Sequence, residues 1–223
     1  MSIYIPNGAN VINSPWVAPA TQDVTAMCWV YFPAAVSGFP RSIVHFQTTS
    51  TSGLALSTTN SAQTINFGAA NQGNTGPGFS YGVWYHLTES IRALTTTNYF
   101  VRGYVNGQMQ LYVNGTGTLG PITSVSLGNN TQSGPANSNP LVGNIRDFRM
   151  FTRELSPSEV QAEYNSSVPV NREGLKFWNR LDDRLATTFT DDLGNTWTTT
   201  GTVTLENGGP RKAWPARRKN YLI

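Results

Sequence analysis

The chain has 223 residues, of which 12% are charged and 11% aromatic, and its formal net charge is +3. That charge is uneven: residues 1–206 hold ten Lys or Arg against twelve Asp or Glu, whereas residues 208–223 hold five Lys or Arg and no acid. A body close to neutral argues against a generally basic surface, so no direct nucleic-acid role is expected.

Abundant Thr, Ser, Asn and Gly, together with this length, favour one large all-β domain. No apolar run approaches the roughly 20 residues that span a bilayer, and the first residues lack the features of a secretory signal. The lone cysteine, Cys28, cannot form an internal disulfide and is expected to be a buried thiol. These features predict folding in a cytoplasm, with neither a membrane span nor a cofactor.

Alternating or continuous apolar runs predict antiparallel strands over 23–32, 41–47, 53–59 and 63–69. The next segment, 68–82, is rich in glycine and poor in apolar residues, which predicts a surface loop. Strands are expected again over 83–94 and 99–105. The string YVNGQMQLYVNG, residues 104–115, contains Asn-Gly twice, and because this dipeptide favours type I′ turns it predicts two turns joined by a short strand.

Beyond a predicted loop over 129–140, residues 141–155 form a strong candidate strand. The sequence SPSEVQAEYN, 156–165, then predicts one short helix. Ser156 can cap it, Pro157 suits its first position, and Glu159 completes a capping box.

Four phrases, TAMCWVYF, VWYHL, LYVNG and LVGNIRDFRMFTRELSPSEVQAEY, resemble the laminin G-like members of the concanavalin A-like lectin/glucanase superfamily. The last phrase carries the specific motif, whose matching residues are Gly143, Ile145, Asp147, Arg149, Arg153, Leu155, Ser156 and Glu159. The resemblance covers roughly residues 3–165. It implies a two-sheet antiparallel jelly-roll sandwich with one short helix near 156–165, in a single domain over 1–207.

The segment 174–201 looks like the part that normally opens such a domain, although here it comes last. Either a second repeat begins and stops, or this segment completes the sandwich in permuted order beside the N-terminal strand. We favour permutation, because about 30 residues could not bury a core of their own.

Residues 208–223 form a basic C-terminal arm that mixes cations with apolar anchors. Such an arm suits docking onto a partner, although it could equally fold back on its own sandwich. The candidate docking residues are Arg211, Lys212, Trp214, Arg217, Arg218, Lys219 and Tyr221.

Catalysis is not expected, because the Glu, Asp and Glu pattern of the family's glucanases is absent. The pairs Asp182–Asp183 and Asp191–Asp192 are adjacent, which suits turns or opposite strand faces better than a glycosidase pair. His45 and His86 lie in separate apolar strands without nearby ligands, so no metal site is assigned. The resemblance leaves a structural calcium open, with Asp147 the motif-matched acid that more often braces its strand.

Seven aromatic residues could form a platform for sugar rings: Trp16, Trp29, Trp84, Tyr85, Tyr99, Tyr104 and Tyr112. Most of them are expected instead to fill the sandwich, Trp29 and Trp84 above all. The long loops 71–79 and 129–139 are the candidate glycan-facing segments by position alone. Their candidate residues are Asn71, Asn74, Phe79, Asn129 and Asn137.

The resemblance implies binding or architecture rather than catalysis, and the chain is similar to laminin G-like domains of phage virions. The first hypothesis is therefore a non-enzymatic capsid decoration or tail-appendage subunit on the virion surface, assembled in the host cytoplasm. Its expected partners are a major capsid or tail protein, further copies of itself and a host-surface glycan. A free-standing carbohydrate-binding or adhesion module is the alternative, and a glycoside hydrolase is third.

Overall fold

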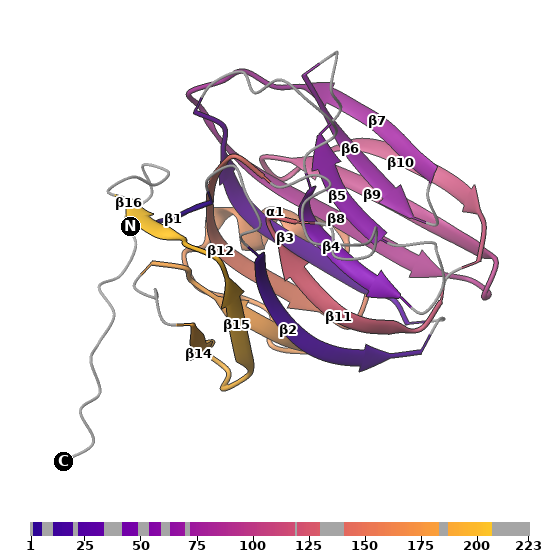
Figure 1. Cartoon of the computed structure of the whole chain (residues 1–223). Helices are drawn as coiled ribbons and strands as arrows, with labels where there is room; N and C mark the ends of the chain where they lie inside the picture. The colour runs from indigo at the N-terminus through magenta and orange to yellow at the C-terminus, as the bar shows by residue number, and fades with distance from the viewer. Residues whose placement is uncertain are drawn as a thin grey trace.

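The computed structural model describes residues 2–5, 11–19, 22–33, 42–48, 54–58, 63–69, 72–118, 120–129, 141–182 and 187–206. Within them, sixteen strands form two antiparallel eight-stranded sheets, and one helix follows β12 (Figure 1). The expected fold class is confirmed: the chain is a two-sheet jelly-roll sandwich with one short helix. No helix in this described part is long and apolar enough to cross a membrane.

The first sheet runs in the order β10-β9-β8-β3-β12-β1-β16, with β13 paired to β12. Its strands are β1 (Ser2–Ile5), β3 (Val24–Tyr31), β8 (Trp84–Ala93), β9 (Asn98–Val105), β10 (Gln108–Thr116), β12 (Gly143–Phe151), β13 (Leu175–Asn179) and β16 (Thr204–Glu206).

The second sheet runs in the order β14-β15-β2-β11-β4-β5-β6-β7. Its strands are β2 (Val11–Ala18), β4 (Ser42–Thr48), β5 (Leu54–Thr58), β6 (Thr64–Ala69), β7 (Gln72–Gly78), β11 (Ile122–Leu127), β14 (Thr188–Thr190) and β15 (Thr196–Thr200).

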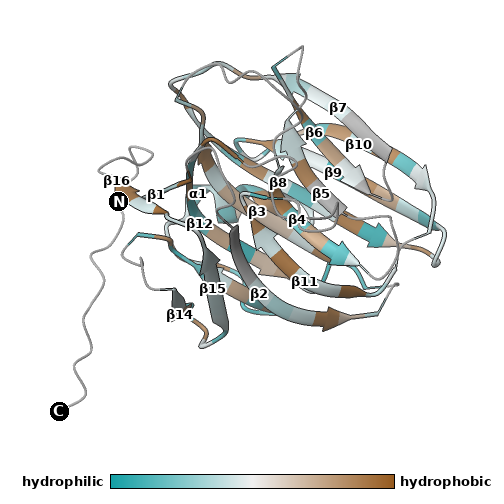
Figure 2. Cartoon of the chain, in the orientation of Figure 1, coloured by the Kyte–Doolittle hydropathy of each residue, from teal (hydrophilic) through white to brown (hydrophobic). Residues whose placement is uncertain are grey.

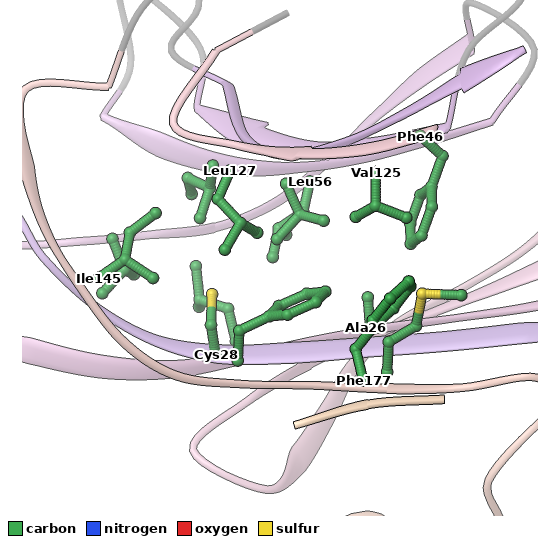
Figure 3. Packing of buried hydrophobic residues seen from close by; sticks show 14 of the residues in the cluster. Ala26, Cys28, Phe46, Leu56, Val125, Leu127, Ile145 and Phe177 are labelled. Carbon is green, nitrogen blue, oxygen red and sulfur yellow. The ribbon is translucent and has the colours of Figure 1, made fainter. Parts of the chain in front are cut away.

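The core lies between the two sheets, because alternate residues of each strand point inward. Figure 3 shows Ala26 and Cys28 of the first sheet opposite Leu56, Val125 and Leu127 of the second. Figure 2 shows the matching pattern, with hydrophobic residues interspersed among polar ones along the strands. Burial raises the pKa of the Cys28 thiol, which therefore packs as a small apolar group.

The last strands lie beside the first ones, as the yellow and indigo ribbons of Figure 1 show. β15 pairs with β2, β16 pairs with β1, and β13 pairs with β12. Trp197 of β15 is fully buried and makes edge contacts with Phe148 and Phe177, at ring-centroid distances of 5.7 and 5.2 Å. The segment 174–201 therefore contributes strands to both sheets and a large side chain to the core.

The helix α1 (Pro157–Asn165) begins with the predicted capping box: Ser156 Oγ accepts from Glu159 N–H, and the Glu159 carboxylate accepts from Ser156 N–H. Its Val160 packs on the outer face of the first sheet, in a second apolar cluster with Met27, Tyr104, Phe151 and Leu155.

This outer face also corrects one expectation. Trp29 does not lie between the sheets, because its indole packs against His86 of β8 and Tyr164 of α1, at 5.2 and 5.6 Å. Trp84 is half-buried, lies against Tyr31 and shares this face by strand alternation. Apolar strand sequence alone could not tell which face the helix covers.

The second Asn-Gly of the repeated string is not a turn, contrary to the sequence prediction. Asn106 and Gly107 form the expected turn, with φ angles of 52° and 77°, but Asn114 and Gly115 lie inside β10. A Cβ atom at Gly115 would lie 2.1 Å from the Tyr99 ring. Glycine is thus required there to make room for a neighbouring aromatic ring.

The segment 68–82 is not simply a loop either, because Gln72–Gly78 forms β7 and pairs with β6. One of its glycines, Gly76, has the same physical cause. The ring of Phe67 lies where a Cβ would stand at Gly76 of β7, and also at Gly103 of β9, 2.7 and 2.4 Å away. Glycine therefore lets one ring fill the space between two strands.

Candidate functional site

The motif residues of β12 form a buried ionic cluster. Asp147 has a φ of 51° where the register between β12 and β3 shifts, which turns its carboxylate toward Arg149. Arg149 donates to Asp147 Oδ2 at 2.6 Å and to the Glu163 carboxylate of α1, while Trp178 Nε1 donates to Asp147 Oδ1 at 3.0 Å. The cluster ties β12 to the helix and to β13.

These contacts decide against calcium at the motif. Both Asp147 oxygens accept hydrogen bonds from side chains, and burial raises the pKa of its carboxyl against the opposing effect of Arg149. Across the described ranges, no three His, Cys, Asp or Glu side chains are grouped so as to hold a metal ion. The residues placed here do not fit a calcium site.

The two histidines are structural. His45 is almost fully buried, and burial lowers its pKa to about 4, so it is neutral at physiological pH. His86 is also buried and packs against Trp29 and Tyr164.

The carboxylates near the end of the chain belong to a turn. Asp191 is buried and accepts hydrogen bonds from the N–H groups of Leu193 and Asn195 and from Trp197 Nε1. Asp192 lies 3.8 Å from Arg180, and burial raises its pKa to about 6. Asp183 falls outside the described residues.

An open cavity of about 320 Å³ lies where β8 ends and where β9 and β10 pair. Such a volume falls within the range of small-molecule sites, roughly 300–1,000 Å³. It is lined by Leu94, Thr95, Asn98, Tyr99, Phe100, Asn114, Gly115 and Thr116. Among the described residues, the lining combines aromatic surface with amide and hydroxyl groups and includes no carboxylate.

Strand register brings these groups together. Phe100 of β9 lies directly between Arg92 of β8 and Asn114 of β10, in one cross-strand row. In the next row, Arg102 stands opposite Tyr112. Because alternate residues share a face and Arg92 and Asn114 are exposed, both rows lie on the outer face of the first sheet.

The aromatic groups of these rows are held in a layered arrangement. The rings of Phe100 and Tyr112 are nearly parallel, 5.5 Å apart at their centroids, and the Arg102 guanidinium lies 5.3 Å from the Tyr112 ring. Arg102 is in turn paired with Glu154, in the segment before α1. Cation–π and ion-pair contacts thus restrain the Tyr112 ring, on which Phe100 stacks, before any ligand binds.

This set of groups suits the recognition of a sugar. The C–H faces of a pyranose can pack on an aromatic ring, while Asn98, Asn114 and Thr116 can donate to and accept from its hydroxyls. We name the cavity and the adjoining Tyr112 the aromatic site.

Of the five sequence-predicted glycan residues, three lie among the described residues. Asn74 lies in β7, the ring of Phe79 packs at a tilt against Phe32 with centroids 4.4 Å apart, and Asn129 is fully buried and so does not face solvent. Asn71 and Asn137 lie outside the described residues, as do all seven candidate docking residues of the arm: Arg211, Lys212, Trp214, Arg217, Arg218, Lys219 and Tyr221.

The sequence patterns point to Tyr112 as a candidate aromatic residue but not to Phe100, Asn98 or Asn114. Alternation could have found them, because Asn98, Phe100 and Arg102 share one face of β9, as Tyr112, Asn114 and Thr116 share one face of β10. Interpreting Asn114-Gly115 as a turn concealed that pattern.

The sandwich fold and the β12 motif define a lectin-like protein. The chain belongs to the concanavalin A-like lectin/glucanases superfamily, whose family model matches residues 6–161. A search of curated proteins found no match.

Solved structures share this fold at low sequence identity. A candidate carbohydrate-binding protein from Bacteroides ovatus superposes with a TM-score of 0.68 at 14% identity, over 93% of this chain and 61% of its own. The present chain thus spans less than two thirds of that protein. A native heptameric SAP-like pentraxin from Limulus polyphemus gives a TM-score of 0.65 at 14% identity, over 91% of this chain and 93% of its own.

Proposed function

We propose that this chain is a non-enzymatic, glycan-contacting subunit of a virion surface. The observation that carries the glycan part is the aromatic site, in which a preorganised Phe100 and Tyr112 adjoin amide and hydroxyl groups in an open cavity. The lectin-like fold, shared with a candidate carbohydrate-binding protein, supports the same assignment.

The lining of the cavity supports binding without hydrolysis. Glycosidases use two carboxyl groups on either side of the scissile bond. The described residues that line the aromatic site include no Asp or Glu, and the nearby Glu154 is engaged by Arg102. We therefore expect no release of reducing ends from β-glucans or host polysaccharides.

The virion setting is supported by the sequence resemblance to phage laminin G-like domains and by the near-neutral body with its basic ending. In this proposal the arm 208–223 docks on a major capsid or tail protein and the chain assembles in several copies, with localisation to the virion surface after assembly in the host cytoplasm. The pentraxin that shares the fold is itself heptameric.

Glycan-array binding of the purified chain tests the first part. Phe100→Ala should remove most binding, since stacking on an aromatic ring contributes a large share of affinity at such sites. Tyr81→Ala is the matched control, because Tyr81 lies before the start of β8, at the opposite end of that strand. Binding that survives Phe100→Ala but not Tyr81→Ala would place glycan contact elsewhere.

Mass spectrometry of purified particles tests the second part. Stoichiometric amounts of the chain on a capsid or tail support the virion role. Glycan binding by a chain that is missing from particles would instead favour the alternative, a free-standing carbohydrate-binding or adhesion module.

A further inference from the structure

A second, polar cavity adjoins the aromatic site. It has a volume of about 510 Å³ and is lined by Pro19, Gln22, Asp23, Arg92, Ala93, Leu94, Thr152 and Arg153. Leu94 lines both cavities. Arg92 lines the polar cavity and is also the cross-strand neighbour of Phe100, so the two cavities meet along the end of β8.

The polar groups of this cavity are held in place by their neighbours. Asp23 Oδ1 accepts from Ala93 N–H at 2.8 Å, which fixes the carboxylate against the end of β8. Gln22 Nε2 donates to the carbonyl oxygens of Thr152 and Asp23, at 2.6 and 3.0 Å. Both side chains are therefore ordered before a ligand arrives.

The two arginines differ in what they can offer a ligand. The Arg153 guanidinium donates to both carboxylate oxygens of Glu159 and to the carbonyls of Glu154 and Glu173. It therefore lines the cavity with most of its donors already engaged. Arg92 is exposed and, within the described residues, has no ion-pair partner. Among those residues, none accepts a hydrogen bond from its five N–H donors, which can therefore serve a ligand.

The charges in and around this cavity balance. Arg153 is neutralised by Glu159, and Arg92 is matched by Asp23 in the same lining. A balanced donor and acceptor pair suits the hydroxyl groups of a neutral sugar, because Asp23 can accept from one hydroxyl and Arg92 can donate to another. An acidic sugar would find no excess of positive charge here.

We infer that the two cavities form one extended site for a neutral oligosaccharide, with one sugar unit at Phe100 and a neighbouring unit between Asp23 and Arg92. The inference rests on the proposed glycan contact and adds to it the class and minimum length of the ligand. Aromatic stacking supplies affinity at one end, and charged hydrogen bonds supply selectivity at the other.

Calorimetric titration of the full chain tests this, with glucose, galactose and N-acetylglucosamine and their β1,4-linked disaccharides and tetrasaccharides as probes. The tetrasaccharide of the preferred sugar should bind about tenfold or more tightly than the monosaccharide, the factor expected from one or two additional charged hydrogen bonds.

Two variants distinguish the contributions of the two cavities to binding. Asp23→Asn keeps a carbonyl oxygen to accept from Ala93 N–H but replaces the second carboxylate oxygen, and Arg92→Ala removes an exposed donor. In each variant the tetrasaccharide should lose its length advantage, meaning its tighter binding compared with the monosaccharide, while monosaccharide binding persists. Asp182→Asn, next to Arg146 toward the other end of β12, is the matched control and should change neither.

Each result decides a different claim. Binding that does not increase with length, or a length advantage that survives both variants, overturns the extended site and leaves the aromatic site standing. Absence of binding to every probe overturns the glycan proposal itself.

Discussion

Glu89 is a carboxylic acid inside the sandwich. It lies between Leu87 and Ile91 on the inward face of β8, cross-strand from Ala26 and Gly103. Burial raises its pKa to about 8, against a smaller opposing effect from the Gly68 backbone N–H. Its carboxyl is therefore protonated in the folded protein at neutral pH.

Glu89 should make folding stability depend on pH. The unfolded chain loses this proton near its ordinary pKa of 4.5, whereas the folded chain keeps it to about pH 8. The free energy of unfolding should thus fall as pH rises between these values and level off above them. Glu89→Gln should flatten this slope and, at pH 8, stabilise the fold by a few kcal/mol, on the order of 1.4 kcal/mol for each unit of pKa shift.

Urea unfolding of the native protein and of the Glu89→Gln variant between pH 4.5 and 9 measures the effect. Parallel curves of unfolding free energy against pH for the two proteins would show that Glu89 ionises normally and contradict its burial.

Arg149 is the second residue with a large expected effect. It is fully buried and pairs with two buried carboxylates, Asp147 and Glu163. Arg149→Met leaves both acids without their cation, so it should destabilise the fold by about 3–5 kcal/mol. Arg153→Met is the control: that ion pair with Glu159 is partly exposed and should cost about 1 kcal/mol or less. Similar melting temperatures for the two variants would disprove a central role for the cluster.

At the scale of elements, β10 depends on a glycine for its packing rather than for its backbone. A methyl group at Gly115 would overlap the Tyr99 ring, so Gly115→Ala should destabilise by about 1–3 kcal/mol. Gly78→Ala in β7 is a matched control, because its new methyl would meet its nearest neighbour at an ordinary 3.6 Å. Thermal unfolding of both variants checks the difference, and an unaffected Gly115→Ala would mean that Tyr99 can move aside.

The helix and its cap illustrate what local sequence can specify. Ser156, Pro157 and Glu159 lie within four residues, and the capping box they predicted is confirmed. Strand pairing depends on distant partners, so Asn114-Gly115 was interpreted as a turn although it continues β10. Local chemistry there allows both structures, and the pairing of Asn114 and Gly115 with β9 decides between them.

For the whole molecule, the last strands should be indispensable. Truncation after Ser167 removes β13 to β16, and with them Trp197 and Phe177 from the core. The remaining sheets would expose apolar surface and leave the edges of β2 and β12 unpaired, so we expect insoluble or molten protein. A soluble truncation that melts cooperatively in calorimetry would make the ending an appendage.

The sequence by itself determined the all-β class, the helix with its cap and the family motif of β12, because strand alternation and capping are written in neighbouring residues. Only the tertiary structure decided the aromatic site. Its Phe100 and Asn114 belong to two strands and meet through register, Arg92 of a third strand stands beside Phe100 at the polar cavity, and Glu154 reaches Arg102 from the segment before the helix. Register is set by the packing of whole sheets, and a shift of one residue would turn each of these side chains to the opposite face.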